Sequence, residues 1–158
     1  MGRLRRIIGL LTDFGLKDPY VAIMKAVILN INPNVEIIDI SHEVEKFNIA
    51  EASFILAASL KYFPRGTVFV VVVDPGVGSS RRALIIQTKN FTFIGPDNGV
   101  LVPAVIKDGV KNLYEILNKN FFLKPLSSTF HGRDIFAPVA AYLTLGTPPE
   151  ILGRKINL

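Results

Sequence analysis

The sequence contains no cysteine among its 158 residues. This absence excludes a disulfide framework and a thiolate metal site, and it fits a cytoplasmic location. The only two histidines, His42 and His131, are far apart, and neither an H-x-x-x-H pair nor a ladder of carboxylates accompanies them. Because metal ligands usually come in closely spaced sets, we expect no metal ion.

Long hydrophobic runs are also missing, although 49% of the residues are hydrophobic and the mean hydropathy is +0.39. Each apolar run is interrupted by Asp, Lys, Pro or Gly, so none is long enough to cross a bilayer. The N-terminus is basic and then apolar, but the run ends at Thr12 and Asp13 without a small-residue cleavage site. That pattern favours a first strand over a signal peptide, and we expect no membrane contact.

A concentrated basic stripe is absent as well, despite a net charge of +5 and an isoelectric point near 9.6. The Lys and Arg residues are scattered and do not alternate with aromatic residues. Scattered charge is typical of solvated surface, whereas nucleic-acid-binding domains concentrate it. We therefore expect no nucleic-acid partner.

Neither G-x-G-x-x-G after the first predicted strand nor a Walker A motif occurs, so the dinucleotide and P-loop hypotheses fail. Asp13, at the end of that strand, is still well placed to accept hydrogen bonds from the vicinal hydroxyls of a ribose. The alternative is an Asp that merely forms a turn before Gly15.

The most apolar stretch, Val68 to Val73, runs directly into Asp74 and Pro75. A run that is apolar at every position suits a strand covered on both faces. Pro75 cannot continue the ladder, and the glycines that follow permit an unusual backbone path, so the chain leaves the sheet at an acid. Ligands of open α/β sheets bind at such strand ends, which makes Asp74 a candidate functional acid or, alternatively, a simple turn cap.

Strand and helix patterns alternate along a chain long enough for one domain. The alternating segments are residues 6–12, 19–30, 35–40, 49–62 and 68–73. Such βαβ units form right-handed parallel pairs of strands. The pattern of a hairpin follows in residues 82–88 and 91–94. A further helix is predicted over residues 135–145. The sequence predicts an α/β fold: a Rossmann-like three-layer domain with a mostly parallel, mixed central sheet.

Two helix starts carry capping signals. Asp18 is the predicted N-cap of the first helix, with Pro19 at its first position. Asn48 and Glu51 have the spacing of a capping box for the second helix.

Three polar sites fall at strand ends or in loops: Asp13, the pair Asp74 and Arg81, and the segment around His131. A carboxylate, an imidazole and a guanidinium in one pocket could activate a water. Asp would fix the imidazole or the water, His would take a proton, and Arg would hold the carboxylate charged. We interpret His42 instead as a surface residue or one that precedes a helix.

Four motifs in this order resemble the S-adenosylmethionine (SAM) hydroxide adenosyltransferase family, the SAM hydrolases related to bacterial fluorinase and chlorinase. They are LLTDFGLKDPYVAIMKAVI, DPGVGSSRR, GPDNGVL and STFHGRDIFAPVAA, within residues 7–153. The resemblance implies hydrolysis of SAM to adenosine and L-methionine by attack of water or hydroxide at C5′. SAM would be the substrate, with no cofactor, and GPDNGVL would have a mainly structural role.

The resemblance also assigns residues. Asp74, Arg81 and His131 match the family's water-handling set, and Asp13 matches the acid that binds the ribose hydroxyls. Phe47 matches an aromatic residue that lines the pocket, and Thr129 matches a residue close to the reacting carbon. Asp18 matches a nearby polar residue, and Gly132 matches the position of the fluorinase's halide-binding serine.

The nucleophile follows from the chemistry of the leaving group. A sulfonium departs readily, so the protein has only to hold and desolvate a water in line with the C–S bond. A halide site needs N–H and hydroxyl donors without an anion beside them. By the same resemblance, the position of Asp74 is an uncharged tyrosine in the halogenases. Gly132 lacks the hydroxyl of the fluorinase's halide-binding serine. Water is favoured, and a SAM-dependent halogenase is the weaker alternative.

Members of the family are longer, with a C-terminal β-barrel domain that supplies many of the substrate contacts. The resemblance therefore implies a homotrimer, in which each active site lies between the N-terminal domain of one subunit and the C-terminal domain of its neighbour. Residues 1–158 would then be the N-terminal α/β catalytic domain, completed by a C-terminal domain or partner chain. The alternative function is an adenosine-binding or assembly half that is inactive without that partner.

Overall fold

A computed structural model describes residues 6–157, so residues 1–5 and 158 of the predicted domain lie outside the described part. Within that part, seven strands form one sheet in the order β2-β1-β3-β5-β4-β6-β7. The strands are β1 Ile7–Thr12, β2 Glu36–Ser41, β3 Val68–Val72, β4 Ala83–Thr88, β5 Thr92–Pro96, β6 Val110–Ile116 and β7 Gly153–Ile156.

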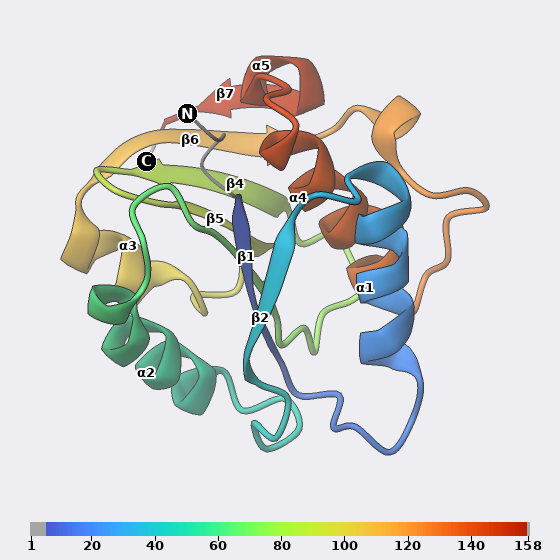
Figure 1. The fold of residues 1–158 in the computed structure, drawn as a ribbon, viewed down its shortest axis with the longest axis horizontal. Coiled ribbons are helices and arrows are strands. Elements are labelled where there is room, and N and C mark those ends of the chain that lie inside the picture. The colour runs from blue at the N-terminus through green and yellow to red at the C-terminus, as the bar shows by residue number, and fades with distance from the viewer. Residues whose placement is uncertain (1–5, 158) are drawn as a thin grey trace.

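Helices cover both faces of this sheet, which gives three layers (Figure 1). The α-helices are α1 Tyr20–Ile31, α2 Ile49–Ser59, α3 Val102–Asp108, α4 Ala137–Thr144 and α5 Pro149–Leu152. One core cluster joins the sheet to α1 and α4, and the other joins its opposite face to α2 and α3. The predicted α/β fold is therefore confirmed.

The sheet is mixed, as predicted. Strands β2, β1, β3 and β5 are parallel, whereas β4 runs antiparallel to both β5 and β6, and β7 runs antiparallel to β6. The connection from β4 to β5 is too short for a crossover and permits only an antiparallel pair.

Strand β3 is the centre of the parallel half. All five of its residues are buried, with Val68, Val70 and Val72 in the cluster under α1 and α4. Phe69 and Val71 belong to the cluster under α2 and α3. The uninterrupted apolar pattern thus reflects burial on both faces, as in other parallel sheets.

The first helix start was predicted incorrectly. The N-cap of α1 is Pro19, without a side-chain cap, and Asp18 lies outside the helix and is exposed. The first turn is closed by the Ile23 amide, which donates to the Pro19 carbonyl at 2.9 Å. At α2 the prediction is half right. The Asn48 side chain accepts from the Glu51 amide at 3.0 Å, but the Glu51 carboxylate accepts from a different residue of the loop.

The last predicted helix begins earlier than expected. Residues Gly132–Phe136 form a π-helical turn that leads directly into α4. Pro138, in the first turn of α4, has no N–H to donate to the carbonyl four residues before it, so regular helix cannot simply extend backwards. Single π turns often occur at functional sites, and this one follows His131 directly.

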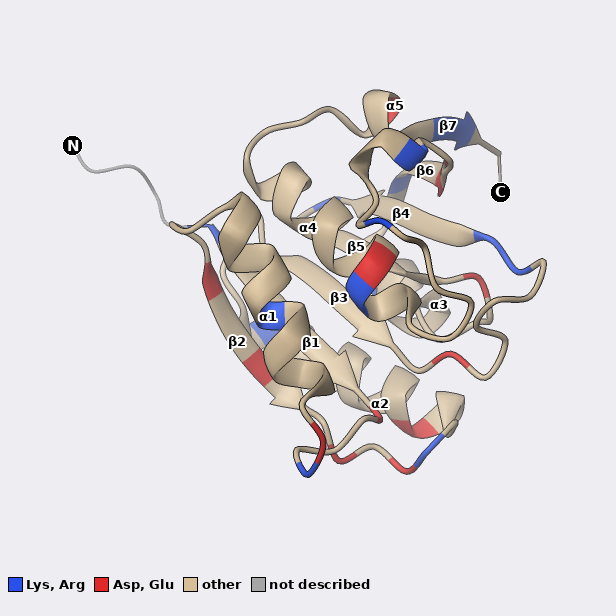
Figure 2. Ribbon diagram, turned by 90° about the vertical axis from the view of Figure 1, so that its right-hand side faces the viewer, with Lys and Arg blue, Asp and Glu red and all other residues tan. Residues whose placement is uncertain are grey.

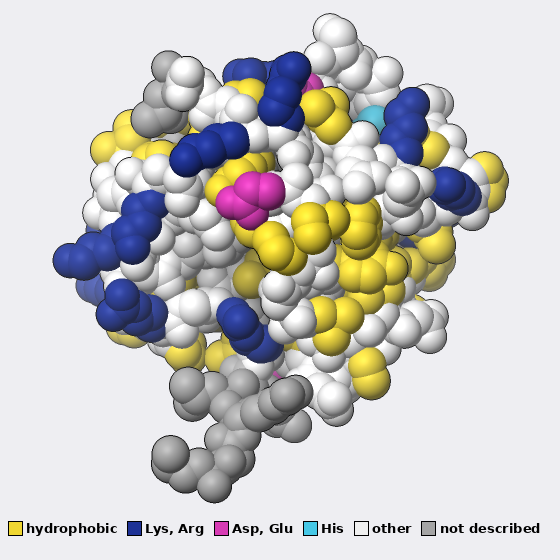
Figure 3. Space-filling model, turned by 90° about the horizontal axis from the view of Figure 1, so that it is seen from above, with side chains coloured by type: hydrophobic (Ala, Val, Ile, Leu, Met, Phe, Trp, Pro, Cys, Tyr) yellow, Lys and Arg dark blue, Asp and Glu magenta, His cyan; other side chains and the backbone are white. Residues whose placement is uncertain are grey.

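The surface agrees with a scattered charge pattern. Blue and red segments are distributed over the ribbon without a basic stripe in the view of Figure 2. From above, Figure 3 shows apolar side chains between separated Lys and Arg residues. None of the helices within residues 6–157 is both long and apolar enough to cross a membrane.

Candidate active site

The candidate site lies where β1 and β3 end, at the lower edge of the sheet in Figure 1. Thr12 pairs with Val72 in the parallel register of these neighbouring strands. Asp13 and Asp74 follow the two strand ends, so the register brings both acids to the same edge. This is the edge at which open α/β sheets bind ligands.

Asp74 and Arg81 form a two-pronged ion pair across the glycine-containing loop. The Arg81 Nε donates to Asp74 Oδ1 at 3.0 Å, and its Nη2 donates to Oδ2. Asp74 is only 6% exposed, and the guanidinium carbon of Arg81 lies 5.4 Å from the centre of the Phe136 ring. Charge-assisted, bidentate pairs of this kind fix both orientation and charge.

His131 joins the pair through Arg81. The Arg81 Nη2 donates to His131 Nδ1 at 2.9 Å, and His131 is buried, with 9% of the residue exposed. A guanidinium has no acceptor, so Nδ1 must accept and the neutral ring carries its proton on Nε2. The structure thus gathers the three predicted residues, with Arg81 between Asp74 and His131.

The electrostatics of His131 favour its neutral form. Burial lowers the pKa of His131, and the positive charge of Arg81 lowers it further. The charge of Asp74 and a hydrogen bond with the Ser127 backbone act in the opposite direction but do not prevail. With Nδ1 occupied by Arg81 and the proton on Nε2, the imidazole has no free lone pair in this arrangement.

The turn of the GPDNGVL motif holds both ends of the Asp74–Arg81 loop. Asn98 Nδ2 donates to the carbonyl of Val73, immediately before Asp74, at 2.9 Å. At the other end, Arg82 Nε donates to Asp97 Oδ2 at 2.9 Å. These contacts agree with the structural role expected of this motif.

A close backbone approach brings the His131 segment to the same loop. Gly78 has a φ of +78°, and a Cβ at this position would lie 2.1 Å from the Ser128 carbonyl oxygen. Asp134, which is fully buried, accepts from the Ser127 amide at 2.8 Å and from Arg133. Sequence reasoning did not anticipate that Asp134 anchors this loop. Its position within a strongly apolar helical segment was the available signal.

Asp13 lies beside Phe47. The Phe47 amide donates to Asp13 Oδ2 at 2.7 Å. The Phe47 side chain is 52% exposed, and its φ of +64° is in the left-handed region. The structure therefore brings these two predicted residues together on neighbouring loops.

The other predicted substrate residues have different environments. Asp18 and Thr129 are exposed, whereas Gly132 is buried. A Cβ on Gly132 would lie 3.2 Å from Met24 Sδ, which is tighter than an ordinary contact. A side chain at this position would therefore require Met24 to move.

The prediction that His42 is a surface residue is wrong. His42 is only 4% exposed. Its Nδ1 shares a hydrogen bond of 2.7 Å with Thr12 Oγ1, and its Nε2 shares another of 2.7 Å with Asp39 Oδ1. The chain after β2 turns back over the end of β1, a long-range contact that local sequence does not reveal.

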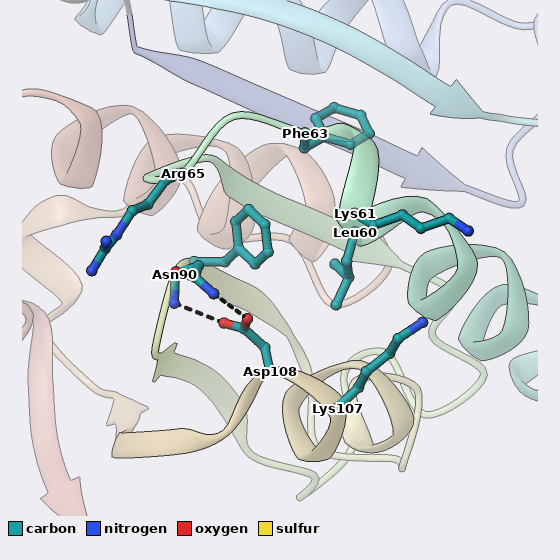
Figure 4. A pocket seen from close by; sticks show the side chains of 8 residues that line it. Leu60, Lys61, Phe63, Arg65, Asn90, Lys107 and Asp108 are labelled. Carbon is teal, nitrogen blue, oxygen red and sulfur yellow. Dashed lines mark hydrogen bonds between the residues drawn. The ribbon is translucent and has the colours of Figure 1, made fainter.

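Two surface hollows lie away from this edge. The one in Figure 4, of about 330 Å³, is at the amino ends of β3 and β5, where Lys61, Arg65 and Lys107 surround an apolar floor. Its acid, Asp108, accepts from the Asn90 backbone at 2.8 Å and side chain at 2.7 Å, so it stabilises a turn. The second, of about 450 Å³, lies between β2 and α2.

Among residues 6–157, no group of three or more His, Asp or Glu side chains is arranged to hold a metal ion.

Comparison with known families gives one match over nearly the whole chain. Residues 8–153 match the family described as the SAM hydroxide adenosyltransferase N-terminal domain. The chain is similar to proteins named (R)-S-adenosyl-L-methionine hydrolase, at 40% identity in Thermus thermophilus and 44% in Methanocaldococcus jannaschii, each over 96% of this chain. A fluorinase of Actinopolyspora mzabensis is 26% identical over 97% of this chain.

Two solved structures are also similar. A crystal structure of an uncharacterized conserved protein from Thermotoga maritima is 53% identical, with a TM-score of 0.93 over 96% of this chain and 59% of its own. A conserved hypothetical protein from Thermus thermophilus is 38% identical, with a TM-score of 0.82 over the same shares. The chain spans 62% of the length of the Thermus hydrolase and 59% of the Methanocaldococcus hydrolase.

Proposed function

The chain belongs to the SAM hydroxide adenosyltransferase family, and from this premise we propose that it is the catalytic N-terminal domain of a SAM hydrolase. The reaction converts SAM and water to adenosine and L-methionine. The observation that carries the proposal is the buried Asp74–Arg81–His131 chain at the carboxyl edge of β3. The relatives named as hydrolases, at 40% and 44% identity, support it.

The reaction is a displacement at C5′. The water oxygen forms a bond to C5′ while the C5′–S bond breaks, and its electron pair returns to sulfur. L-Methionine leaves as a neutral thioether, and the attacking water loses one proton overall. Because the leaving group needs no acid, most of the catalysis consists of placing and desolvating the water.

Asp74 is the group proposed to hold that water. Its carboxylate oxygens each retain a lone pair beyond the bonds from Arg81, and these can accept a hydrogen bond from the water. Arg81 aims the carboxylate, and His131 holds Arg81 in place through Nδ1. The proton passes to Asp74 or to solvent once the C–O bond forms, since Nδ1 of His131 accepts from Arg81 and Nε2 already carries the ring proton.

The substrate contacts are assigned along the neighbouring loops. Asp13 accepts hydrogen bonds from the ribose hydroxyls, and Phe47 provides an aromatic wall. Thr129 lies near the reacting carbon, with Asp18 and Gly132 beside the site. These roles rest on the family resemblance and on the placement of Asp13 and Phe47 side by side.

The charge of these loops suits a sulfonium. Residues 13–18 and 42–48 carry more acids than lysines: Asp13, Asp18, Glu43 and Glu45 against Lys17 and Lys46. Figure 2 shows this charge on the loops below α1 and α2. A negative local field attracts a cationic ligand.

A halide is the less favoured nucleophile. The Asp74 carboxylate would repel it, and Gly132 offers no hydroxyl. The fluorinase relative, at 26% identity, is also more distant than the hydrolases. These observations favour water.

The proposal includes a C-terminal domain or partner chain that completes the substrate site, and a homotrimer as the assembly. It also includes a cytoplasmic location, SAM as the only small-molecule partner, and neither nucleic acid nor a cofactor. A half that binds adenosine without catalysis is the alternative, because the chain spans less than two thirds of its hydrolase relatives.

Incubation with SAM tests the proposal. The chain is assayed alone and with the C-terminal segment of the Thermus relative, and adenosine is quantified by chromatography. Adenosine in either assay is the expected result, and its absence from both would contradict hydrolysis. Calorimetric binding of adenosine without turnover would identify the binding half, and a halide-dependent 5′-halo-5′-deoxyadenosine would identify a halogenase.

Asp74→Ala provides the residue-level test. Turnover should fall at least about a hundredfold, because the water loses its acceptor, while adenosine binding should change little. Glu115→Ala is the matched control, since it removes an acid of β6, three strands away from β3, that is paired with the exposed Arg154. An unaffected rate in Asp74→Ala would refute the role of Asp74.

A further inference from the structure

Three hydrogen bonds join the loop after β2 to the loop after β1. His42 provides two of them, one through its carbonyl to the Gly15 amide and one through Nδ1 to Thr12 Oγ1. The third runs from the Phe47 amide to Asp13 Oδ2. All three are 2.7 Å long, so the loop of residues 42–48 is fixed against the end of β1.

Phe47 adopts a backbone conformation that its side chain disfavours. Its φ of +64° makes it the only residue other than glycine with a positive φ among residues 6–157. The left-handed region is disfavoured for any residue with a Cβ, because the Cβ comes too close to the following carbonyl oxygen. A bulky residue keeps such a conformation only when its surroundings hold it there, and strained residues of this kind cluster at ligand sites.

The restraint on Phe47 comes from a carboxylate. The bond from the Phe47 amide to Asp13 Oδ2 is charge-assisted, and such bonds are stronger than neutral ones. The ring itself contributes little, since it is half exposed and belongs to neither core cluster. The conformation of Phe47 therefore depends mainly on its backbone contacts, and Asp13 supplies the charged one.

The same carboxylate retains a second oxygen for a ligand. Within residues 6–157, no hydrogen bond reaches Asp13 Oδ1, although the residue is buried. An available acceptor next to an exposed aromatic ring matches a nucleoside, which has vicinal hydroxyls on one part and a flat, weakly polar surface on another.

We propose that Asp13 is a positioning residue as well as a ribose contact. Oδ2 holds Phe47 in the left-handed conformation, and Oδ1 accepts from the ligand. One side chain thus sets both the hydrogen-bond acceptor and the aromatic wall of the nucleoside site. This inference rests on the proposed function only in taking the ligand to be a nucleoside.

A tryptophan reporter can test the two roles separately. The sequence has no tryptophan, so Phe47→Trp introduces a single fluorophore at the wall. Its anisotropy without ligand reports how firmly the wall is held, and its quenching by added adenosine reports binding. The reporter is combined with Asp13→Asn, Asp13→Ala or the control Glu43→Ala, and each variant's fold is verified by circular dichroism.

The expected pattern distinguishes the two oxygens. Asp13→Asn can still accept from the amide of residue 47, so its anisotropy should match the parent, while adenosine affinity falls about tenfold. Asp13→Ala removes both functions, so the anisotropy should fall before adenosine is added, and the affinity should fall further. Glu43→Ala removes an exposed acid of the same loop. Because adenosine carries no charge, the loss of this acid should leave both readouts unchanged.

Two results would overturn parts of the account, and they differ. Unchanged anisotropy in a folded Asp13→Ala protein would refute the positioning role, whatever reaction the protein catalyses. A reduced anisotropy of Asp13→Ala, with no quenching by adenosine in any variant even when the C-terminal segment of the Thermus relative is present, would refute the nucleoside ligand. It would also refute the proposed function, but not the control of Phe47 by Asp13.

Discussion

Arg81 joins an acid of one loop to a histidine of another, and its charge acts differently on the two. It binds the carboxylate form of Asp74 through two N–H donors, and it lowers the pKa of the neighbouring His131. The imidazole therefore serves as a neutral acceptor that keeps the guanidinium in place. In the proposed mechanism the acid, rather than the histidine, therefore holds the water.

The lowered pKa of His131 makes stability depend on pH. In the unfolded chain the imidazole titrates near pH 6.5, whereas burial and Arg81 keep it neutral to a lower pH in the fold. The unfolded state then binds more protons, so the free energy of unfolding should fall as the pH drops below about 6.5. Urea unfolding at a series of pH values measures this dependence.

His131→Gln is the matched variant, because its amide oxygen can still accept from Arg81 but does not titrate. Its free energy of unfolding should fall less steeply below about pH 6.5 than that of the wild type. Parallel pH profiles for the two proteins would contradict this description of His131.

Asn98→Ala should destabilise the protein by roughly 1–3 kcal/mol, because the buried Val73 carbonyl loses its donor. Turnover should fall as well, since Val73 precedes Asp74.

Asn112→Ala is a suitable control for Asn98→Ala. Within the described residues the Asn112 side chain bonds only to Gln87 Oε1, at 3.1 Å, and the expected change is within about 0.5 kcal/mol. Thermal melts and adenosine assays make the comparison, and equal effects would argue against a special role of the turn.

At the scale of elements, the predictable features were those encoded by local patterns. The uniform apolar run of β3, the short link between β4 and β5, and the cap at Asn48 each depend on nearby residues, and each was predicted. The burial of His42 and the anchoring by Asp134 depend on segments brought together by the fold. Patterns of 3.6 or 2 residues carry no information about such contacts.

The close packing of the loop at Gly78 against the His131 segment can be tested by comparing alanine substitutions at two glycines. Gly78 and Gly109 both have positive φ, so alanine at either position should cost roughly 1 kcal/mol from the backbone. Only at Gly78 would the Cβ meet another segment, the Ser128 carbonyl, and a Cβ on Gly109 meets nothing within 4 Å. Gly78→Ala should therefore also displace the His131 segment and reduce turnover at least about tenfold, as single-turnover assays can show. Equal activity of the two variants would contradict the packing argument.

At the scale of the whole molecule, the two halves of the sheet have different tasks. The parallel strands β1 and β3 end at the acids of the site, and the antiparallel strands β4, β6 and β7 extend the sheet beside them. Asp74, Arg81 and His131 come from loops that only this arrangement gathers. Residue types and motif order singled out these three residues as candidates, but their mutual geometry, with Arg81 in the middle, required the folded chain.

The central claim is that water attacks C5′ of SAM at this site, and isotope incorporation tests it most directly. SAM is incubated with the protein, together with the C-terminal segment of the Thermus relative, in water enriched in the heavy oxygen isotope, and the adenosine is analysed by mass spectrometry. The account predicts one heavy oxygen in the adenosine, at the 5′-hydroxyl, at the enrichment of the solvent. Adenosine without the label, or no adenosine at all, would contradict it.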